Sequence, residues 1–194
     1  MLHDNRHKFQ RRKAGDIPYV NHPIEVAAIL TEAGVSDPEV IAAALLHDTI
    51  EDTDTKPEEI EAAFGPRVLR MVQQCSDDKN LPYLERKRLQ IEHAPHLPDD
   101  TKLVKMGDKI ANLRGLLLPY TSIWNVEVTQ GYFAWSRAVC EGCRGANAKL
   151  DAMADELFTK TFKTADGKEY PATPSDMTQE QVLERYYAVK KQSG

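Results

Sequence analysis

The chain has 194 residues, of which 41% are hydrophobic and 28% charged, and its 25 Lys and Arg set against 30 Asp and Glu leave a net charge of −5. This length suits one domain, and the composition is that of a soluble globular protein, which excludes disordered, collagen-like and coiled-coil chains. Because nucleic acids are usually bound through a basic surface, the acidic balance also argues against a nucleic acid partner.

The first half of the chain shows helical periodicity punctuated by Pro and Gly. One helix is predicted over residues 24–33, where Gly34 closes it. A second helix starts at Ser36-Asp37-Pro38, a cap followed by Pro in the first turn, and its run from Val40 to Leu46 is apolar enough to be central. Further helices are predicted over residues 57–64, 66–75 and 83–93.

The second half continues the pattern. A helix capped by Pro98-Asp99-Asp100 is expected to reach Leu118 before Pro119, and a long helix is expected over residues 126–158, with a break near Gly142 or Gly145. Residues 163–175 have the composition of a loop, and residues 177–191 are predicted to form a final helix. Since no convincing run of alternating strands occurs, the predicted fold class is all-α with no substantial sheet.

Targeting and redox signals are weak. No segment approaches the roughly 20 apolar residues that span a bilayer, and the N-terminus lacks the apolar core of a signal peptide. We therefore expect a cytoplasmic protein, with the nucleus as the alternative, and no membrane partner. The three cysteines are expected to stay reduced. Cys140 and Cys143 have the spacing of half a zinc site, but without a second pair nearby an ordinary helix-borne pair is favoured.

The strongest chemical signal is the segment from His47 to Asp52, His-Asp-Thr-Ile-Glu-Asp, at the end of the apolar second helix. On a continuous helix, His47, Asp48, Glu51 and Asp52 would lie within about 140° of one another at about 100° per residue. A solvated helix end is the simple interpretation. However, the macrodipole disfavours carboxylates at a helix C-terminus, and this cluster directly follows a core-like run. A bound divalent cation therefore explains the cluster better.

Two further residues could complete such a metal site. His22 precedes Pro23 at a helix start, and Asp108 lies inside an apolar helix beside Lys105 and Lys109. Taken singly, His22 could be a cap and Asp108 half of an ion pair. With His47 and Asp48 they form a mixed nitrogen and oxygen set that suits Mn²⁺, Fe²⁺ or Zn²⁺ better than Ca²⁺. Such a site leaves room for a water activated by the metal, the usual nucleophile in metal-assisted hydrolysis.

At this point the sequence resembles a known family. The order His22, His47-Asp48 and Asp108 is similar to the metal pattern of the HD-domain phosphohydrolases. Several separated segments resemble the hydrolase domain of the RelA/SpoT alarmone enzymes, and most closely their stand-alone metazoan SpoT homologues, over roughly residues 5–160. These segments are Arg11-Arg12-Lys13, Pro18-Tyr19-Val20-Asn21-His22-Pro23, residues 47–53, Ser76-Asp77-Asp78-Lys79, residues 84–90 and residues 105–113.

The resemblance implies a compact HD-domain bundle of about ten helices. It assigns residues 1–162 to the hydrolase domain and leaves residues 163–194 as a C-terminal extension of loop and helix with no counterpart. The implied activity is metal-dependent hydrolysis of guanosine-3′,5′-bis(diphosphate), (p)ppGpp, to GDP or GTP and pyrophosphate. The implied metal is Mn²⁺, although Zn²⁺ and Fe²⁺ also suit the ligand types.

The resemblance also implies roles for single residues. His22, His47, Asp48 and Asp108 would be metal ligands, and Glu51 and Asp52 would orient the water and move protons, one of them with a raised pKa. The implied contacts to the nucleotide are Arg12, Lys13, Asn112, Tyr132 and, at a phosphate, Lys79. Core packing is an equal alternative for Tyr132 and Trp135. A solvated surface is the favoured interpretation of Lys79, Arg86, Lys87 and Arg88, with the phosphate contact as the alternative for Lys79.

Two other functions stay open from the sequence. One is a phosphatase that removes the 2′-phosphate of NADPH in the same site, because that substrate presents a phosphate monoester on a similar sugar. The other is a non-catalytic HD scaffold that binds nucleotide. The intact ligand set and the Glu51-Asp52 pair argue against a scaffold, which has no need for a cluster of mutually repelling carboxylates.

Overall fold

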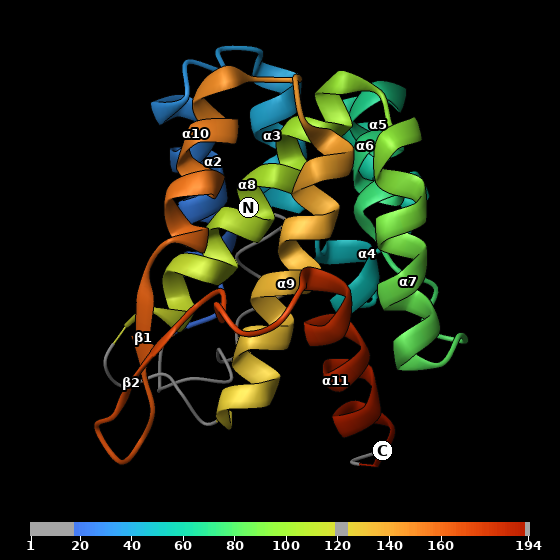
Figure 1. Ribbon diagram of the computed structural model, residues 1–194. Coiled ribbons are helices and arrows are strands. Elements are labelled where there is room, and N and C mark those ends of the chain that lie inside the picture. Colours follow the sequence, from blue (N-terminus) through green and yellow to red (C-terminus); the bar gives the residue numbers. More distant parts are fainter. Residues whose placement is uncertain (1–17, 119–123, 193–194) are drawn as a thin grey trace.

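The computed structural model describes residues 18–118 and 124–192, and this part of the chain is mostly helical (Figure 1). Arg12, Lys13 and Pro119 lie outside the described residues. The elements in chain order are α2 (Asn21–Glu32), α3 (Pro38–Leu46), α4 (Thr49–Asp52), α5 (Pro57–Phe64), α6 (Pro66–Cys75), α7 (Tyr83–His93), the 3₁₀ helix η1 (Ala94–His96), α8 (Asp99–Leu116), α9 (Val126–Cys143), α10 (Ala148–Phe158), β1 (Thr161–Lys163), β2 (Glu169–Pro171) and α11 (Gln179–Gln192). The all-α prediction is confirmed.

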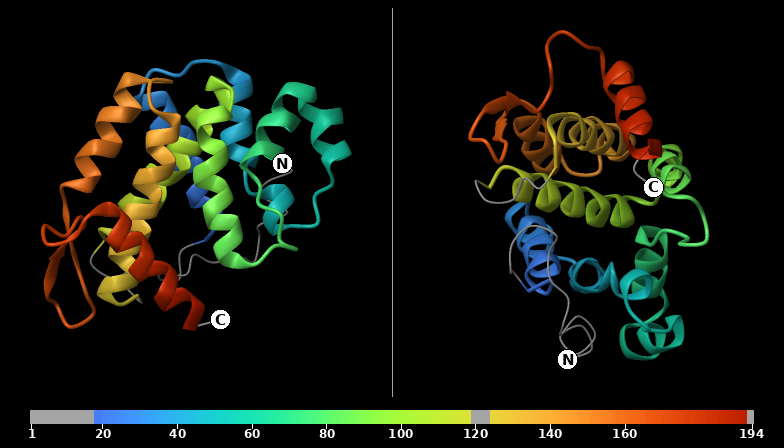
Figure 2. Two further views of the ribbon diagram at one scale, coloured as in Figure 1. Left: turned by 45° about the vertical axis from the view of Figure 1, so that its right-hand side comes forward. Right: turned by 90° about the horizontal axis from the view of Figure 1, so that it is seen from below.

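Helix α8 is the centre of the bundle. In the right-hand view of Figure 2 it lies between a layer that contains α2, α3 and α6 and a layer that contains α9 and α10, and it contacts all five helices. Its apolar residues Val104, Ile110 and Leu113 are fully buried. A Cβ atom at Gly107 would lie 3.1 Å from side-chain carbons of both Leu30 and Val26, so glycine lets α2 approach α8 closely. This contact packs the middle and second half of α2 against the middle of α8, and His22 at the start of α2 lies beside Asp108 of α8.

Helix α3 begins as predicted but ends earlier. The Asp37 carboxylate accepts a hydrogen bond from the Glu39 backbone N–H, and Pro38 occupies the first turn. The helix stops at Leu46, and the Thr49 hydroxyl donates to the Leu46 carbonyl at 2.6 Å. The placement of His47, Asp48, Glu51 and Asp52 on one continuous helix was therefore wrong. His47 and Asp48 lie on a turn, and Glu51 and Asp52 lie on the separate short helix α4.

The predicted break in the long C-terminal helix is confirmed. Helix α9 ends at Cys143, Gly145 has a φ of +92°, and the Asn147 side chain accepts hydrogen bonds from the backbone N–H groups of Lys149 and Leu150 to start α10. Asn147 is thus a side-chain cap of the kind that starts helices. Helix α8 ends at Leu116, two residues before the Leu118 expected from the position of Pro119.

The C-terminal segment contains more order than a loop. Strands β1 and β2 form an antiparallel hairpin in which Phe162 pairs with Tyr170, so the prediction of a loop over residues 163–175 was wrong at the strands. Phe162 is buried and stacks on Phe133 of α9, a long-range contact that local composition does not reveal. The final helix is confirmed as α11, which packs along α9 (Figure 1). The predicted boundary after residue 162 falls inside β1.

Two further expectations concern cysteines and membranes. Cys140 and Cys143 are buried, free thiols in α9, and burial raises the pKa of Cys140 to about 12 and that of Cys143 to about 11. They stay protonated at neutral pH, as expected of an ordinary helix-borne pair. No helix in residues 18–118 or 124–192 combines the length and the apolar character that crossing a membrane requires.

Candidate metal centre and active site

A polar cavity of about 410 Å³ opens between α8 and the elements around it. Its lining comes from α2, the turn after α3, α4, the loop after α6, α7, α8 and α9. Predicted site residues that are far apart in the chain meet here: the histidines and carboxylates of the metal set, Glu51, Asp52, Lys79, Asn112 and Tyr132. The volume is within the range of cavities that hold a small-molecule ligand.

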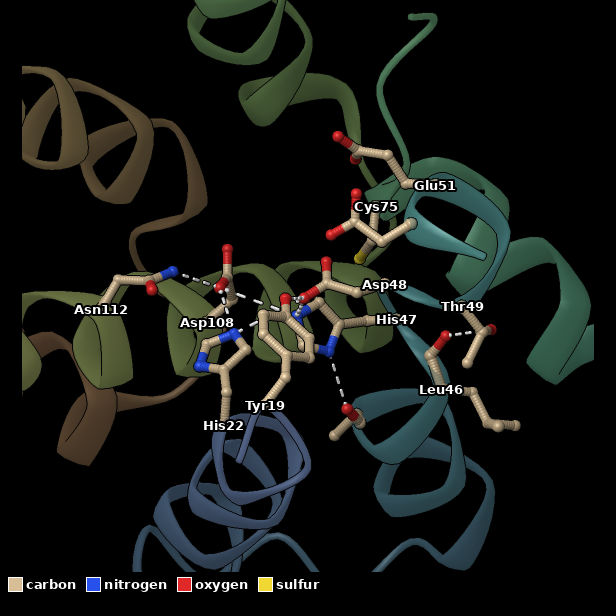
Figure 3. A network of polar contacts seen from close by, with 12 residues as sticks. Tyr19, His22, Leu46, His47, Asp48, Thr49, Glu51, Cys75, Asp108 and Asn112 are labelled. Atoms are coloured by element: carbon tan, nitrogen blue, oxygen red, sulfur yellow. Dashed lines mark hydrogen bonds and ion pairs between the residues drawn. The ribbon is translucent and has the colours of Figure 1, made fainter. Parts of the chain in front are cut away.

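Three of the predicted ligands, His22, His47 and Asp48, bring their polar atoms within 4.8 Å of one another, and Asp108 of α8 approaches both histidines (Figure 3). The Nε2 atom of His22 lies 3.1 Å from Oδ1 of Asp108 and 3.7 Å from Oδ2 of Asp48. The Nε2 atom of His47 lies 3.0 Å from Oδ2 of Asp48 and 3.7 Å from Oδ1 of Asp108. His22, His47, Asp48 and Asp108 therefore converge, as the metal-site hypothesis requires.

The tautomer of His47 shows that this cluster suits a cation. The Nδ1–H of His47 donates to the Ala44 carbonyl oxygen at 2.8 Å, which leaves Nε2 as the ring atom with a lone pair. That buried Nε2 has no hydrogen-bond donor and faces two carboxylates. Acceptors that face one another need a cation between them, which is either a proton or a metal. Although burial opposes it, the two carboxylates raise the pKa of His47. A divalent ion held by two imidazoles and two carboxylates would satisfy all of these atoms.

Tyr19 and Asn112 fix the two carboxylates of the cluster. The Tyr19 hydroxyl donates a hydrogen bond to Asp48 (Figure 3), and burial raises the pKa of Tyr19, so this hydroxyl stays protonated. The Asn112 amide donates to Oδ1 of Asp108 at 2.6 Å. Asn112, a predicted nucleotide contact, therefore also orients a predicted ligand. Such outer partners commonly set the direction of metal ligands.

Lys109 balances the charge of Asp108 inside the protein. Its ammonium lies 2.8 Å from Oδ2 of Asp108 and 4.4 Å from the centre of the Trp135 ring, and the side chain is only 5% exposed. Burial would lower the pKa of Lys109, but the charge of Asp108 raises it. Both groups are therefore ionised, and each depends on the other.

The two carboxylates of α4 differ in their surroundings. Glu51 is largely enclosed: its Oε2 accepts a hydrogen bond from the Asp77 backbone N–H at 3.0 Å, and its Oε1 lies 3.7 Å from Arg86. Burial raises the pKa of Glu51, as predicted for one member of the pair. Asp52 is more exposed and forms an ion pair with the exposed ammonium of Lys79 at 2.7 Å. Glu51 is thus the member of the pair that is better suited to accept and release a proton.

The cavity lining also carries cations. Arg86 and Lys87 come from α7, and Lys105 and Lys109 come from α8. The expectation that Lys87 lies on a solvated helix face was wrong, because its ammonium sits 3.6 Å from the centre of the Trp135 ring. Burial lowers the pKa of Lys87 to about 7. The predicted alternative of core packing is confirmed for Trp135, which is fully buried, whereas Tyr132 lines the cavity.

Tyr19, Lys87 and Lys109 line the site but were not among the residues predicted for it. One signal was available, since Lys105 and Lys109 are spaced four residues apart on the apolar side of α8, where an unpaired lysine is unusual. For Tyr19 and Lys87 the partners lie far away in the chain. Tyr19 contacts Asp48, and Lys87 contacts Trp135.

Comparison with known proteins adds independent information. A family model described as "HD domain" matches residues 2–123. The guanosine-3′,5′-bis(diphosphate) 3′-pyrophosphohydrolase MESH1 of Xenopus tropicalis is 50% identical over 155 residues, which are 79% of this chain and 87% of that protein. The human MESH1 protein has the same identity and coverage.

A solved structure agrees with these relatives. It is described as a metazoan ortholog of SpoT that hydrolyses ppGpp and plays a role in starvation responses. It superposes with a TM-score of 0.78 at 45% identity, covering 81% of this chain and 89% of that one. The similarity therefore extends from sequence to fold over most of both molecules.

Proposed function

This chain belongs to the HD-domain family and, within it, to the RelA/SpoT homologues, and we propose that it hydrolyses guanosine-3′,5′-bis(diphosphate) at the 3′ position. With ppGpp the products are GDP and pyrophosphate, and with pppGpp they are GTP and pyrophosphate. The observation that carries the proposal is one cavity that joins the His and Asp cluster to a wall of lysine and arginine. This combination suits a polyanionic substrate, although the whole chain has a net charge of −5.

The proposed hydrolysis uses a divalent metal ion. We assign it to His22, His47, Asp48 and Asp108, and we propose Mn²⁺, for which mixed imidazole and carboxylate ligands are suitable; Fe²⁺ and Zn²⁺ suit the same set. When bound, the metal supplies Lewis acidity toward phosphate oxygens and water. Tyr19 and Asn112 hold Asp48 and Asp108 in the orientation that binding needs.

Glu51 is the proposed general base. In the reaction, water attacks the phosphorus atom attached to the ribose 3′ oxygen, the bond between that phosphorus and the 3′ oxygen breaks, and the 3′ oxygen gains a proton. Glu51 accepts the proton that the attacking water loses, because burial raises its pKa and so makes it a stronger base. Asp52 assists by orienting the water, and its ion pair with Lys79 holds it at the mouth of the cavity.

The substrate contacts are proposed on charge and position. Lys79, Asn112 and Tyr132 line the cavity, and the resemblance adds Arg12 and Lys13. Lys87 and Lys109 extend the cationic wall and are proposed to meet phosphate oxygens. All of these contacts serve a free nucleotide, so a nucleic acid partner is not part of the proposal.

The decisive experiment compares two substrates. The purified protein is incubated with Mn²⁺ and either ppGpp or NADPH, and pyrophosphate and orthophosphate are measured separately. Pyrophosphate from ppGpp is expected. Orthophosphate from NADPH without pyrophosphate from ppGpp would contradict the proposal in favour of the phosphatase alternative, which the names of the relatives do not support. Binding of both nucleotides without turnover would indicate a non-catalytic scaffold.

A variant separates chemistry from metal binding. Glu51→Gln keeps the size of the side chain but cannot accept a proton, so kcat should fall by roughly 10²-fold or more while the metal content stays equal to that of the unmodified protein. Glu58→Gln, on the exposed first turn of α5, is the matched control and should leave kcat unchanged. A Glu51→Gln protein with normal kcat would remove Glu51 from the mechanism.

A further inference from the structure

The C-terminal helix α11 reaches the wall of the cavity. It packs along α9 and also touches α7 (Figure 1). Its anchor is Tyr186, a fully buried side chain that lies against Gly131 of α9. A Cβ atom at Gly131 would come within 2.3 Å of the Tyr186 Cβ, so only glycine allows this approach. Arg185 adds a hydrogen bond of 2.7 Å to Gln130, next to that glycine. The sequence of α9 is therefore shaped to receive α11.

One hydrogen bond connects α11 to the cavity. The hydroxyls of Tyr186 and Tyr83 lie 2.8 Å apart, and Tyr83 lines the cavity at the first turn of α7. Burial raises the pKa of both tyrosines, so both hydroxyls stay protonated at neutral pH and one can donate to the other. Tyr83 is 40% exposed, so its side chain has freedom to move unless this bond restrains it.

Tyr83 in turn stands among the cations of the cavity wall. The Lys87 ammonium lies 5.5 Å from the centre of its ring, and the Arg86 guanidinium lies 5.8 Å from it. The Lys190 ammonium of α11 lies 5.9 Å from the same ring and 5.5 Å from the ring of Trp124. These distances are within the range of cation–π attraction. The position of the Tyr83 ring therefore affects the positions of these three positively charged groups.

We infer that α11 is part of the substrate-binding apparatus, with Tyr186 as a positioning residue that holds Tyr83 and, through it, the cations of α7 against the cavity. This inference rests on the proposed function, since it concerns binding of a polyphosphate nucleotide in the same cavity. It gives a role to the C-terminal extension. Tyr186 does not touch the reacting atoms, so its loss should weaken substrate binding more than it slows the chemical step.

The test removes single hydroxyl groups. Tyr186→Phe keeps the ring that fills the space beside Gly131 but breaks the bond to Tyr83. We expect KM for ppGpp to rise roughly 2- to 10-fold, the worth of one hydrogen bond, with little change in kcat. Tyr83→Phe breaks the same bond, so the double variant should be no worse than either single variant. Tyr187→Phe, one residue further along α11, is the control and should keep the original KM.

Equilibrium binding provides a second readout that does not depend on turnover. The dissociation constant of ppGpp is measured by calorimetry in the presence of EDTA, and it should rise in Tyr186→Phe by a factor similar to that of KM. A protein that binds ppGpp without cleaving it would refute the proposed function but leave this comparison decisive. The inference would be overturned if Tyr186→Phe left both KM and the dissociation constant unchanged. Additive effects in the double variant would also overturn it, and so would a failure of the unmodified protein to bind ppGpp.

Gly131→Ala tests the docking of α11 independently of the hydroxyl. The added methyl group would displace Tyr186, so the substitution should raise KM at least as much as Tyr186→Phe. A Gly131→Ala protein that keeps its helical circular dichroism and its original KM would also contradict the inference.

Discussion

Replacing Asp108 by Asn tests the centre of the site in two ways. Asn keeps the size of the side chain but removes its charge, so the proposed metal set loses a carboxylate and Lys109 loses its counter-ion. The distance of 2.8 Å between Lys109 and Asp108 corresponds to an attraction of about 6 kcal/mol at an effective dielectric constant of about 20. Desolvation of both charges offsets part of this attraction.

The loss of stability expected for Asp108→Asn comes from the charge of Lys109, which stays buried. Removing one partner of a buried ion pair typically costs about 3–5 kcal/mol, because the other charge is left without compensation. Relief of the repulsion between Asp108 and Asp48 reduces this cost, so we expect the free energy of unfolding to fall by about 2–4 kcal/mol in the metal-free protein. Urea unfolding in the presence of EDTA measures this quantity without a contribution from the metal.

Metal content is the second measurement on the same variant. After gel filtration, Asp108→Asn should hold much less Mn²⁺ per chain than the unmodified protein. Asp155→Asn is the matched control, since it breaks an exposed ion pair with Arg144 and should cost less than about 1 kcal/mol and no metal. A metal-free Asp108→Asn protein as stable as the unmodified one would refute the charge argument, and one that retains a full equivalent of Mn²⁺ would remove Asp108 from the proposed ligands.

Three further predictions concern charges around the site and on the surface. Because burial lowers the pKa of Lys87 to about 7, its positive charge is lost as pH rises through 7, so KM for ppGpp should increase from pH 6 to pH 8, and Lys87→Met should flatten this part of the profile. Although burial raises the pKa of Asp100, hydrogen bonds from Arg70 at 2.6 Å and Arg67 at 3.0 Å lower it below its usual value. The pKa of Asp100 is lower in the folded protein than in the unfolded chain, so its stabilisation is present above the unfolded pKa and is lost as pH falls through the folded pKa. Asp100→Asn should therefore lower the free energy of unfolding by about 1–2 kcal/mol at pH 7 and by less in acid, as measured by urea unfolding. Lys79→Ala breaks only an exposed ion pair with Asp52, so its free energy of unfolding should change by less than about 1 kcal/mol while KM for ppGpp rises.

Local sequence signals determined most of the helices. Pro38, Pro57 and Pro66 stand in the first turns of α3, α5 and α6, where the missing N–H costs nothing, and the predicted starts of these helices agree with the structure. Such signals act within about four residues, so they can be read from a short window of sequence. The same holds for the His-Asp pair at residues 47–48, whose chemistry is unusual enough to indicate a metal before any fold is known.

The end of α3 is a feature that local sequence signals did not predict. The helical periodicity predicted one helix that continues through the cluster, whereas in the structure α3 ends at Leu46, whose carbonyl accepts a hydrogen bond from the Thr49 hydroxyl. The convergence of the four predicted ligands therefore does not come from one helix face. It comes from the packing of α2 and the turn after α3 against α8, which brings His22 to Asp108 across 86 residues of sequence.

By itself, then, the sequence determined the helical class, most helix boundaries and the family, because these depend on neighbouring residues or on motifs in a fixed order. The tertiary structure alone decided that the half-buried Lys87 lies over Trp135, that Tyr19 contacts Asp48, and that α11 reaches Tyr83. The physical reason is that burial and charge pairing are properties of the space around a side chain. That space is enclosed by segments that are far apart in the chain and share no local signal, as for Tyr83 and Tyr186, which are 103 positions apart.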